Sequence, residues 1–237
     1  RRLTQPEAES LALPCVCLAE YQTAGRGRNE RRWIGEFGCS VLASFAWEIA
    51  EPRLLSGMSL IVGVGVVRGL ERLGVTGLGL KWPNDVQVDG RKLAGILIET
   101  RQRPGRGWLT VTGIGLNVHT SGGMSEIDQP WRALDTLSDS PLKRTDVAVA
   151  LIDEVTQVLE RLARGDGAPL IEAWRALDVT RGQPVTVHGS GERIEGIGCG
   201  VEQDGSLRVE VRGEIRTFHS GEVSLRLGHQ GEKESGT

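Results

Sequence analysis

The feature that most constrains this chain is a glycine- and arginine-rich stretch, residues 22–33, set between two apolar runs. It reads Gln-Thr-Ala-Gly-Arg-Gly-Arg-Asn-Glu-Arg-Arg-Trp. The runs Cys15 to Ala19 and Val41 to Ile49 are predicted to be strands, so the stretch is the loop that joins them. Its glycines allow a close approach to a ligand, and its arginines offer paired donors to carboxylate or phosphate. Taken alone, it favours a solvated basic loop or a nucleic-acid contact over an anion site, because basic loops are usually solvated.

The residues that follow predict helices and strands of ordinary length. Helices are expected at 54–73, capped by Ser56, at 146–162, capped by Thr145, and at 169–177. Strands are expected at 78–82 and 109–118, and the pair Asp89-Gly90 predicts a hairpin between 86–88 and 92–99. Residues 119–130 are rich in serine and glycine and are predicted to be a mobile loop that orders when ligand binds.

The pattern changes near residues 181–182. From Gln183 to Leu227, short alternating strands are separated by glycine-containing turns, which is typical of a small all-β barrel or sandwich. We therefore predict one domain over 1–181, a second over 182–228, and a disordered tail over 229–237.

Composition excludes several classes of protein. The net charge is −3, which argues against a protein that coats nucleic acid. The four cysteines (Cys15, Cys17, Cys39 and Cys199) form no CxxC pair, so neither a zinc site nor a disulfide framework is indicated. A reducing, cytoplasmic compartment is therefore expected. No apolar stretch is long enough to cross a membrane, and no membrane partner is expected.

Three further clusters could carry chemistry. Residues 81–85, Lys-Trp-Pro-Asn-Asp, end a strand in a turn that presents an amide and a carboxylate, although such turns are common. In residues 91–95, Lys92 is expected to share a strand face with Ala94, Ile96 and Ile98, either at the exposed strand end or aimed at a buried anion. In residues 113–117, Gly-Ile-Gly-Leu-Asn, two glycines mark a bulge or a ligand lying against the main chain.

Together, in this order and spacing, the four motifs closely resemble the biotin protein ligase family. The resemblance runs from about Cys15 to Arg226. It implies an α+β fold: a mixed β-sheet flanked by helices, similar to class II aminoacyl-tRNA synthetases, followed by a small SH3-like β-barrel. It also implies an ATP-dependent ligase that activates biotin as biotinoyl-AMP. The biotin is then transferred to one lysine of a biotin carboxyl carrier protein, an acetyl-CoA carboxylase subunit.

The resemblance assigns roles to individual residues. It implies that Lys92 and Arg26 are catalytic, with Lys92 between the biotin carboxylate and the α-phosphate and Arg26 on the carboxylate. Arg28 is expected to close over the intermediate. The residues implied for biotin are Gln22, Gly25, Arg26, Gly27, Arg28, Lys92, Gly95 and Gly115. Those implied for ATP or the adenylate are Arg28, Asn84, Lys92, Asn117 and Trp131, with Mg²⁺ near Asn117.

The chain departs from the family pattern in two places and leaves alternatives open. A Ser-Thr-Asn stretch is expected upstream of the position where this sequence begins, and Asn29-Glu30 replace a basic residue and a glycine. No DNA-binding domain is indicated, so no DNA partner is expected, while a homodimer is left open. A lipoate or octanoate ligase of the same superfamily is the nearest alternative. A non-enzymatic biotin sensor and a nucleic-acid-binding module are the others.

Overall fold

The computed structural model describes residues 12–29, 31–120, 129–137, 142–189, 192–220 and 223–227. The predicted tail at 229–237 and most of the predicted mobile loop at 119–130 therefore lie outside the described residues. No helix in the described part is both long and apolar enough to cross a membrane.

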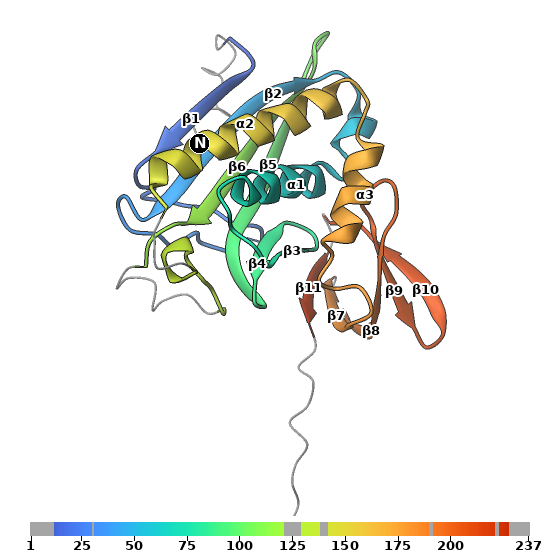
Figure 1. Cartoon of the computed structure of the whole chain (residues 1–237). Coiled ribbons are helices and arrows are strands. Elements are labelled where there is room, and N and C mark those ends of the chain that lie inside the picture. The colour runs from blue at the N-terminus through green and yellow to red at the C-terminus, as the bar shows by residue number, and fades with distance from the viewer. Residues whose placement is uncertain are drawn as a thin grey trace, which may run out of the picture.

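The first unit is built on a six-stranded sheet (Figure 1). Its strands are β1 (Cys15–Ala19), β2 (Ser40–Ile49), β3 (Leu78–Lys81), β4 (Asp85–Val88), β5 (Arg91–Arg103) and β6 (Gly107–Asn117). They lie in the order β1-β2-β6-β5-β4-β3. All pairs of named strands are antiparallel, and among the described residues the parallel pairing consists of two isolated bridges, Leu80 with Asp178 and Lys92 with Trp131. The predicted strands and the hairpin at Asp89-Gly90 are confirmed.

Helices α1 (Met58–Glu71) and α2 (Arg144–Ala163) cover one face of this sheet, and α3 (Ala168–Ala176) packs against α1. Short 3₁₀ turns are η3 (Pro52–Leu55) and η5 (Leu134–Thr136). The helices α1 and α2 pack against each other, and both contact the sheet (Figure 1). They pack closely because α1 carries glycines: a methyl on Gly65 would lie 2.9 Å from a methyl of Val158. The opposite face of the sheet carries the site described below.

Two predicted helix starts were wrong. The helix α1 begins at Met58, after the separate turn η3, and its N-cap is Gly57 with φ of 70°. The Ser56 hydroxyl instead donates to the carbonyl of Asp204 at 2.6 Å. Thr145 lies inside the first turn of α2, whose N-cap is Lys143. For α1, the contact of Ser56 with a distant segment, which the local pattern does not show, takes the place of the predicted cap.

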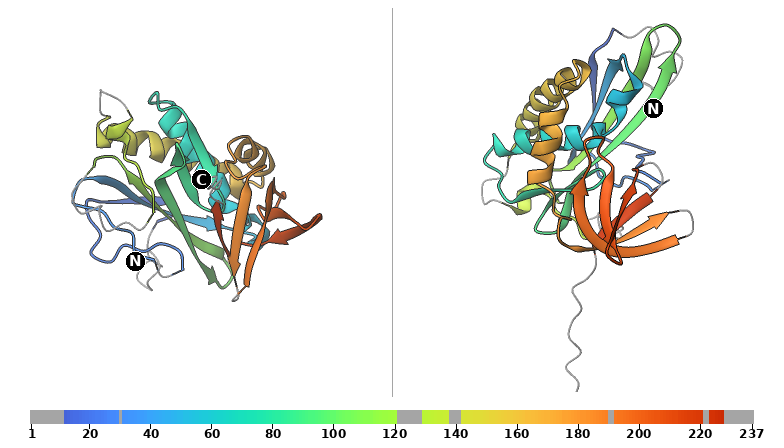
Figure 2. Two further views of the ribbon diagram at one scale, coloured as in Figure 1. Left: turned by 90° about the horizontal axis from the view of Figure 1, so that it is seen from below. Right: turned by 90° about the vertical axis from the view of Figure 1, so that its right-hand side faces the viewer.

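The second unit is a five-stranded antiparallel sheet beside the first (Figure 2). Its strands are β7 (Pro184–Gly189), β8 (Glu192–Val201), β9 (Leu207–Val211), β10 (Glu214–Phe218) and β11 (Val223–Leu227), in the order β10-β9-β8-β7-β11. Among the described residues β10 and β11 are not paired, so the sheet is not closed into the predicted barrel. The change of pattern near residue 181 is real, but alternation alone does not show whether the first and last strands meet.

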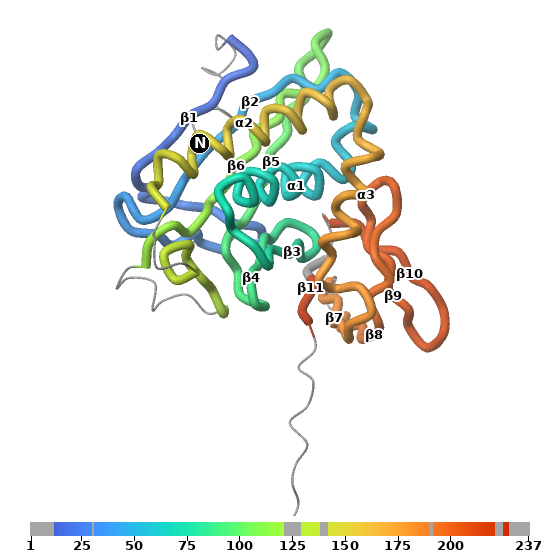
Figure 3. Tube along the Cα trace, viewed as in Figure 1, coloured from blue at the N-terminus to red at the C-terminus, as the bar shows by residue number. Residues whose placement is uncertain are grey.

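The second sheet lies beside the first unit (Figure 3), and the two share one apolar core. A single buried cluster includes Phe45 of the first unit and Val209 of the second. At the contact between the units, the Trp82 indole donates to the carbonyl of Gly205 at 3.0 Å. The domain boundary itself stays a prediction.

Candidate active site

The glycine-arginine stretch folds as a tight hairpin over the open face of the first sheet. The Gly27 amide donates to the Arg31 carbonyl at 2.7 Å, and the Trp33 amide donates to the Gly25 carbonyl at 3.0 Å. The turn is made by Asn29, whose φ of 52° lies in the left-handed region that asparagine tolerates better than most residues. The hairpin is thus held by its own backbone bonds.

Beneath the hairpin, strand register aligns one row of residues across five strands. The row contains Leu42, Gly115, Gly95, Asp85 and Lys81, from β2, β6, β5, β4 and β3. Directly paired residues point to the same face of a sheet. The row therefore combines a bare glycine floor with a carboxylate and an ammonium at one end.

Lys92 reaches this face through a β-bulge. The prediction that Lys92 shares a strand face with Ala94 was therefore wrong. Val86 pairs with Ala94 but Gln87 pairs with Lys92, so Leu93 is an extra residue in β5. The bulge turns Leu93 and Ala94 toward the buried core and Lys92 toward Gly95. The Lys92 Nζ lies 2.7 Å from Oδ1 of Asp85, so the lysine meets a carboxylate within the site.

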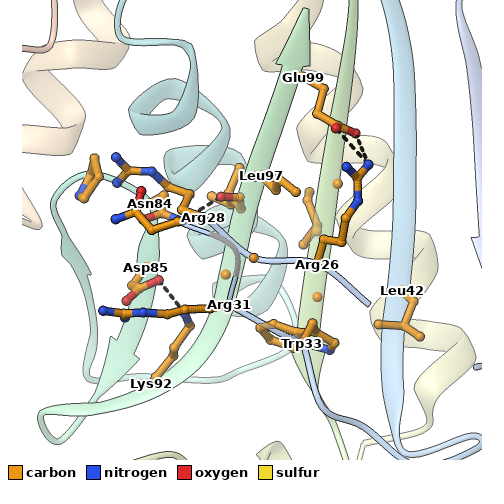
Figure 4. Close-up of a pocket in the computed structure, with 18 of the residues that line it drawn as sticks. Arg26, Arg28, Arg31, Trp33, Leu42, Asn84, Asp85, Lys92, Leu97 and Glu99 are labelled. Atoms are coloured by element: carbon orange, nitrogen blue, oxygen red, sulfur yellow. Dashed lines mark hydrogen bonds and ion pairs between the residues drawn. The ribbon is translucent and has the colours of Figure 1, made fainter. Parts of the chain in front are cut away.

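The hairpin and the sheet enclose a cavity of about 210 Å³ (Figure 4). The cations around one end are Arg28, Arg31, Lys81, Lys92 and Arg226. Burial lowers the pKa of Lys81, and the nearby Lys92, Arg226 and Arg31 lower it further against the attraction of Asp85. An anion bound here would relieve this repulsion. The geometry favours a carboxylate or phosphate ligand at this end.

Trp33 lies on the glycine floor. A methyl added to Gly115 would lie 2.5 Å from the Trp33 ring, and one added to Gly95 would lie 3.1 Å from it. Lys92 Nζ is 5.8 Å from the centroid of the same ring. Only glycine allows the indole, or a ligand in its place, to lie this close to the main chain.

Arg26 and Arg28 point in different directions (Figure 4). The Arg26 guanidinium pairs with Glu99 of β5 at 2.8 Å, on the side of the cavity away from Lys92. Arg28 donates to the carbonyl of Ser220 in the second unit, and burial lowers its pKa. Arg28 is therefore placed at the cationic end, whereas Arg26 is placed at the opposite end.

Most of the expected site residues come together here. The cavity is lined by Gln22, Arg26, Gly27, Arg28, Asn84, Lys92, Gly95 and Gly115. Gly25, Asn117 and Trp131 are not among its described lining residues. Asn117 is 3% exposed, and its Nδ2 donates to the Arg132 carbonyl at 3.1 Å. Trp131 follows Pro130, whose carbonyl accepts from the Lys92 amide.

Other lining residues were not predicted as site residues. They include Arg31, Trp33, Ser44, Lys81, Asp85, Glu99 and Arg226. Lys81 and Asp85 belong to a motif already noted, and Arg31 and Trp33 lie within the hairpin stretch. Glu99 and Ser44 carry no local signal, since only strand pairing brings them to the cavity.

The residues present fit a protein-held metal poorly. In the described ranges, no group of three or more His, Cys, Asp or Glu side chains could hold a metal ion. The Asn117 side chain, expected near Mg²⁺, packs away from the cavity, and Asp85 is already paired with Lys92. A metal at this site would depend on oxygens other than those of these side chains.

Comparison with known families identifies relatives over most of the chain. Residues 3–117 match the biotin/lipoate A/B protein ligase family, and residues 180–226 match the biotin protein ligase C terminal domain. The chain is 31% identical over 214 residues to a biotin–[acetyl-CoA-carboxylase] ligase of Mycobacterium tuberculosis, covering 88% of this chain and 77% of that protein.

Two further similarities concern a larger relative and a solved structure. The bifunctional ligase/repressor BirA of Escherichia coli is 35% identical over 213 residues, which are 89% of this chain. The match spans only 66% of the length of BirA. The biotin protein ligase of Aquifex aeolicus in complex with biotin and ATP superposes with a TM-score of 0.81 at 24% identity, covering 95% of each chain. This superposition shows a shared fold.

Proposed function

Since the chain belongs to the biotin protein ligase family, we propose that it joins biotin to a lysine of a biotin carboxyl carrier protein in two ATP-dependent steps. The observation that supports this most directly is the cavity itself. Its floor includes Gly95, Gly113 and Gly115, where an uncharged ring can approach the main chain, and cations cluster at one end, where a carboxylate and phosphates can bind.

In the first step, a biotin carboxylate oxygen attacks the α-phosphorus of ATP, and pyrophosphate leaves with the electrons of the broken P–O bond. Two anions must approach each other, so the main obstacle is electrostatic. Lys92 lies beside Gly95 at the boundary between floor and cations, where it can contact both anions. Lys81, Arg31 and Arg226 add positive charge for the phosphates. Catalysis then consists of positioning and charge neutralisation, with no enzyme nucleophile.

In the second step, the carrier's lysine amine attacks the acyl carbon of biotinoyl-AMP. AMP leaves, the amine loses a proton, and an amide bond remains. The mixed anhydride would react with water or any amine, so the hairpin must keep it enclosed. In this proposal Arg28, which donates to the Ser220 carbonyl at the cationic end, closes over the adenylate.

Magnesium enters this proposal as an ion bound to ATP. Mg²⁺ keeps several waters and is often held through phosphate oxygens, which is compatible with a site that offers few protein ligands. We derive no step through it. A homodimer and the identity of the carrier also stay predictions, which light scattering and labelling of candidate carriers would test.

Pyrophosphate release tests the proposal. The purified chain with ATP and biotin should release pyrophosphate and form biotinoyl-AMP, while biotin or ATP alone should give neither. A binding module without activity would give no pyrophosphate. Lipoate or octanoate should not compete with biotin, and competition at equal concentration would favour the other ligases of the superfamily.

A further inference from the structure

Next to the row that contains Gly95 and Gly115, a second row of paired residues is not covered by Trp33. Ser44 of β2 pairs with Gly113 of β6, which pairs with Leu97 of β5, and all three line the cavity. A methyl added to Gly113 would meet only the Leu97 carbonyl oxygen, at 3.6 Å. There is therefore open space above Gly113, whereas Trp33 fills the space above Gly115.

The open space has defined ends. On one side is the row of Gly95 and Gly115, which Trp33 covers. On the other side is the row in which Glu99 and Ala46 both pair with Val111. The Arg26–Glu99 ion pair stands over that third row. Residues on one face of a strand repeat every two positions, so the outer rows are about 13 Å apart. The space suits one end of a small ligand whose carboxylate lies toward Lys92.

Ser44 is one of three polar residues on its face of β2, with Ser40 and Glu48 toward the strand ends. Its neighbours on that face are the buried apolar residues Leu42 and Ala46, whereas Ser44 is half-buried at the cavity wall. Within the described part of the chain, no protein group is recorded as a hydrogen-bond partner of its hydroxyl. Its Oγ is open to the cavity, where water can bond to it, and a hydroxyl can both donate and accept. A ligand that displaces this water has to replace its hydrogen bond to Ser44, which a polar ring can do.

We propose that Ser44 is a specificity-determining residue that hydrogen-bonds the polar ring of the substrate above Gly113. This inference rests on the proposed function. Biotin carries a cyclic urea at the end opposite its carboxylate, with N–H donors and a C=O acceptor that a hydroxyl can match. Lipoate carries a dithiolane ring, which has neither. Ser44 would therefore favour biotin over lipoate-like acids through a single hydrogen bond.

Calorimetric titration of Ser44→Ala with biotin and with lipoate, without ATP, tests this. Loss of one hydrogen bond should weaken biotin binding about two- to tenfold and leave lipoate binding unchanged. The matched control is Thr100→Ala, which removes an exposed hydroxyl of β5 outside the cavity and should change neither affinity. An unchanged biotin affinity, or an equal loss for both acids, would overturn the role of Ser44.

A second variant tests the open space. Gly113→Ala should fold normally, because the new methyl makes only an ordinary contact. It should nevertheless weaken biotin binding about tenfold or more, since the methyl would occupy the proposed ring position. A normal melting temperature with normal biotin affinity would show that the ring lies elsewhere. If the wild-type chain itself bound no biotin, the proposed function would fail, an outcome distinct from failure in these variants alone.

Discussion

At the scale of single residues, the positive charges at the cationic end of the cavity lower the stability of the free protein but favour the binding of an anion. Lys81 is half-buried beside other cations, and its partial burial is the main cause of its lowered pKa. Its charge is therefore unfavourable in the free protein and favourable once an anion binds. Residues of this kind are expected where binding, and not folding, has determined the choice of side chain.

Lys81→Met tests whether the charge of Lys81 lowers stability and favours anion binding. Methionine preserves much of the length and removes the charge, so the melting temperature should rise by a few degrees while ATP affinity falls about tenfold or more. In the native chain the lowered Lys81 pKa means that the unfolded state binds more protons between that pKa and the ordinary value of about 10.4.

The pH dependence follows from the sign of this difference. The destabilisation of the folded state by the Lys81 charge is fully present below the pKa of Lys81 in the folded state. It disappears as the pH rises toward the pKa in the unfolded state. Wild-type stability should therefore gain relative to Lys81→Met as pH rises through this window. Calorimetric melting at several pH values checks this, and a constant difference across the window would contradict it.

Arg28 should retain the adenylate. Arg28→Gly removes charge-assisted hydrogen bonds worth about 1.5–3 kcal/mol each, so retention of the intermediate should weaken by about one to two orders of magnitude. Adenylate should still form, escape and label albumin added to biotin and ATP. The exposed Arg32, which is not among the lining residues, provides the control Arg32→Gly. Normal pyrophosphate release without albumin labelling would remove Arg28 from this role.

At the scale of elements, local signals predicted the strands and one turn but not the contacts between distant segments. Asp89 and Gly90 adopt φ of 49° and 70°, the left-handed pair expected of a tight hairpin. The bulge at Leu93 depends on how β5 pairs with β4, and the ion pair of Arg26 and Glu99 joins residues 73 positions apart. Neither the bulge nor the ion pair can be predicted from the local spacing of apolar residues. The family resemblance supplied most of the site residues, but not these geometries.

The hairpin turn gives a prediction at this scale. Asn29→Val places a β-branched residue at φ of 52°, which costs about 1–2 kcal/mol, so the closed hairpin should be less populated. We expect faster tryptic cleavage at the hairpin arginines and a biotin dissociation rate about tenfold higher. Asn29→Gly accepts the same φ and should resemble the wild type. Identical behaviour of all three chains would show that the turn does not control closure.

At the scale of the whole molecule, the site spans both sheets. Arg226 of β11 lines the cationic end, and the carbonyl of Ser220 holds Arg28. The second sheet is fixed to the first by the Trp82 indole on Gly205, at the motif that also supplies Lys81 and Asp85. The contact between the sheets should therefore influence the phosphate end of the cavity more than the ring end.

Gly205→Ala tests this coupling. Gly205 has φ of 80°, and an added methyl would lie 2.6 Å from the Cα of Gly57, so the second sheet must shift away from the first. Gly213→Ala is the matched control in the same sheet: its φ is 86°, and an added methyl would meet nothing within 4 Å. Both variants carry the same backbone strain, about 1–2 kcal/mol. Only Gly205→Ala also disturbs the contact between the sheets. ATP affinity should fall markedly in Gly205→Ala alone, while biotin affinity stays near the wild-type value in both. Equal ATP affinities in the two variants would show that the second sheet contributes to the fold without setting the phosphate end of the site.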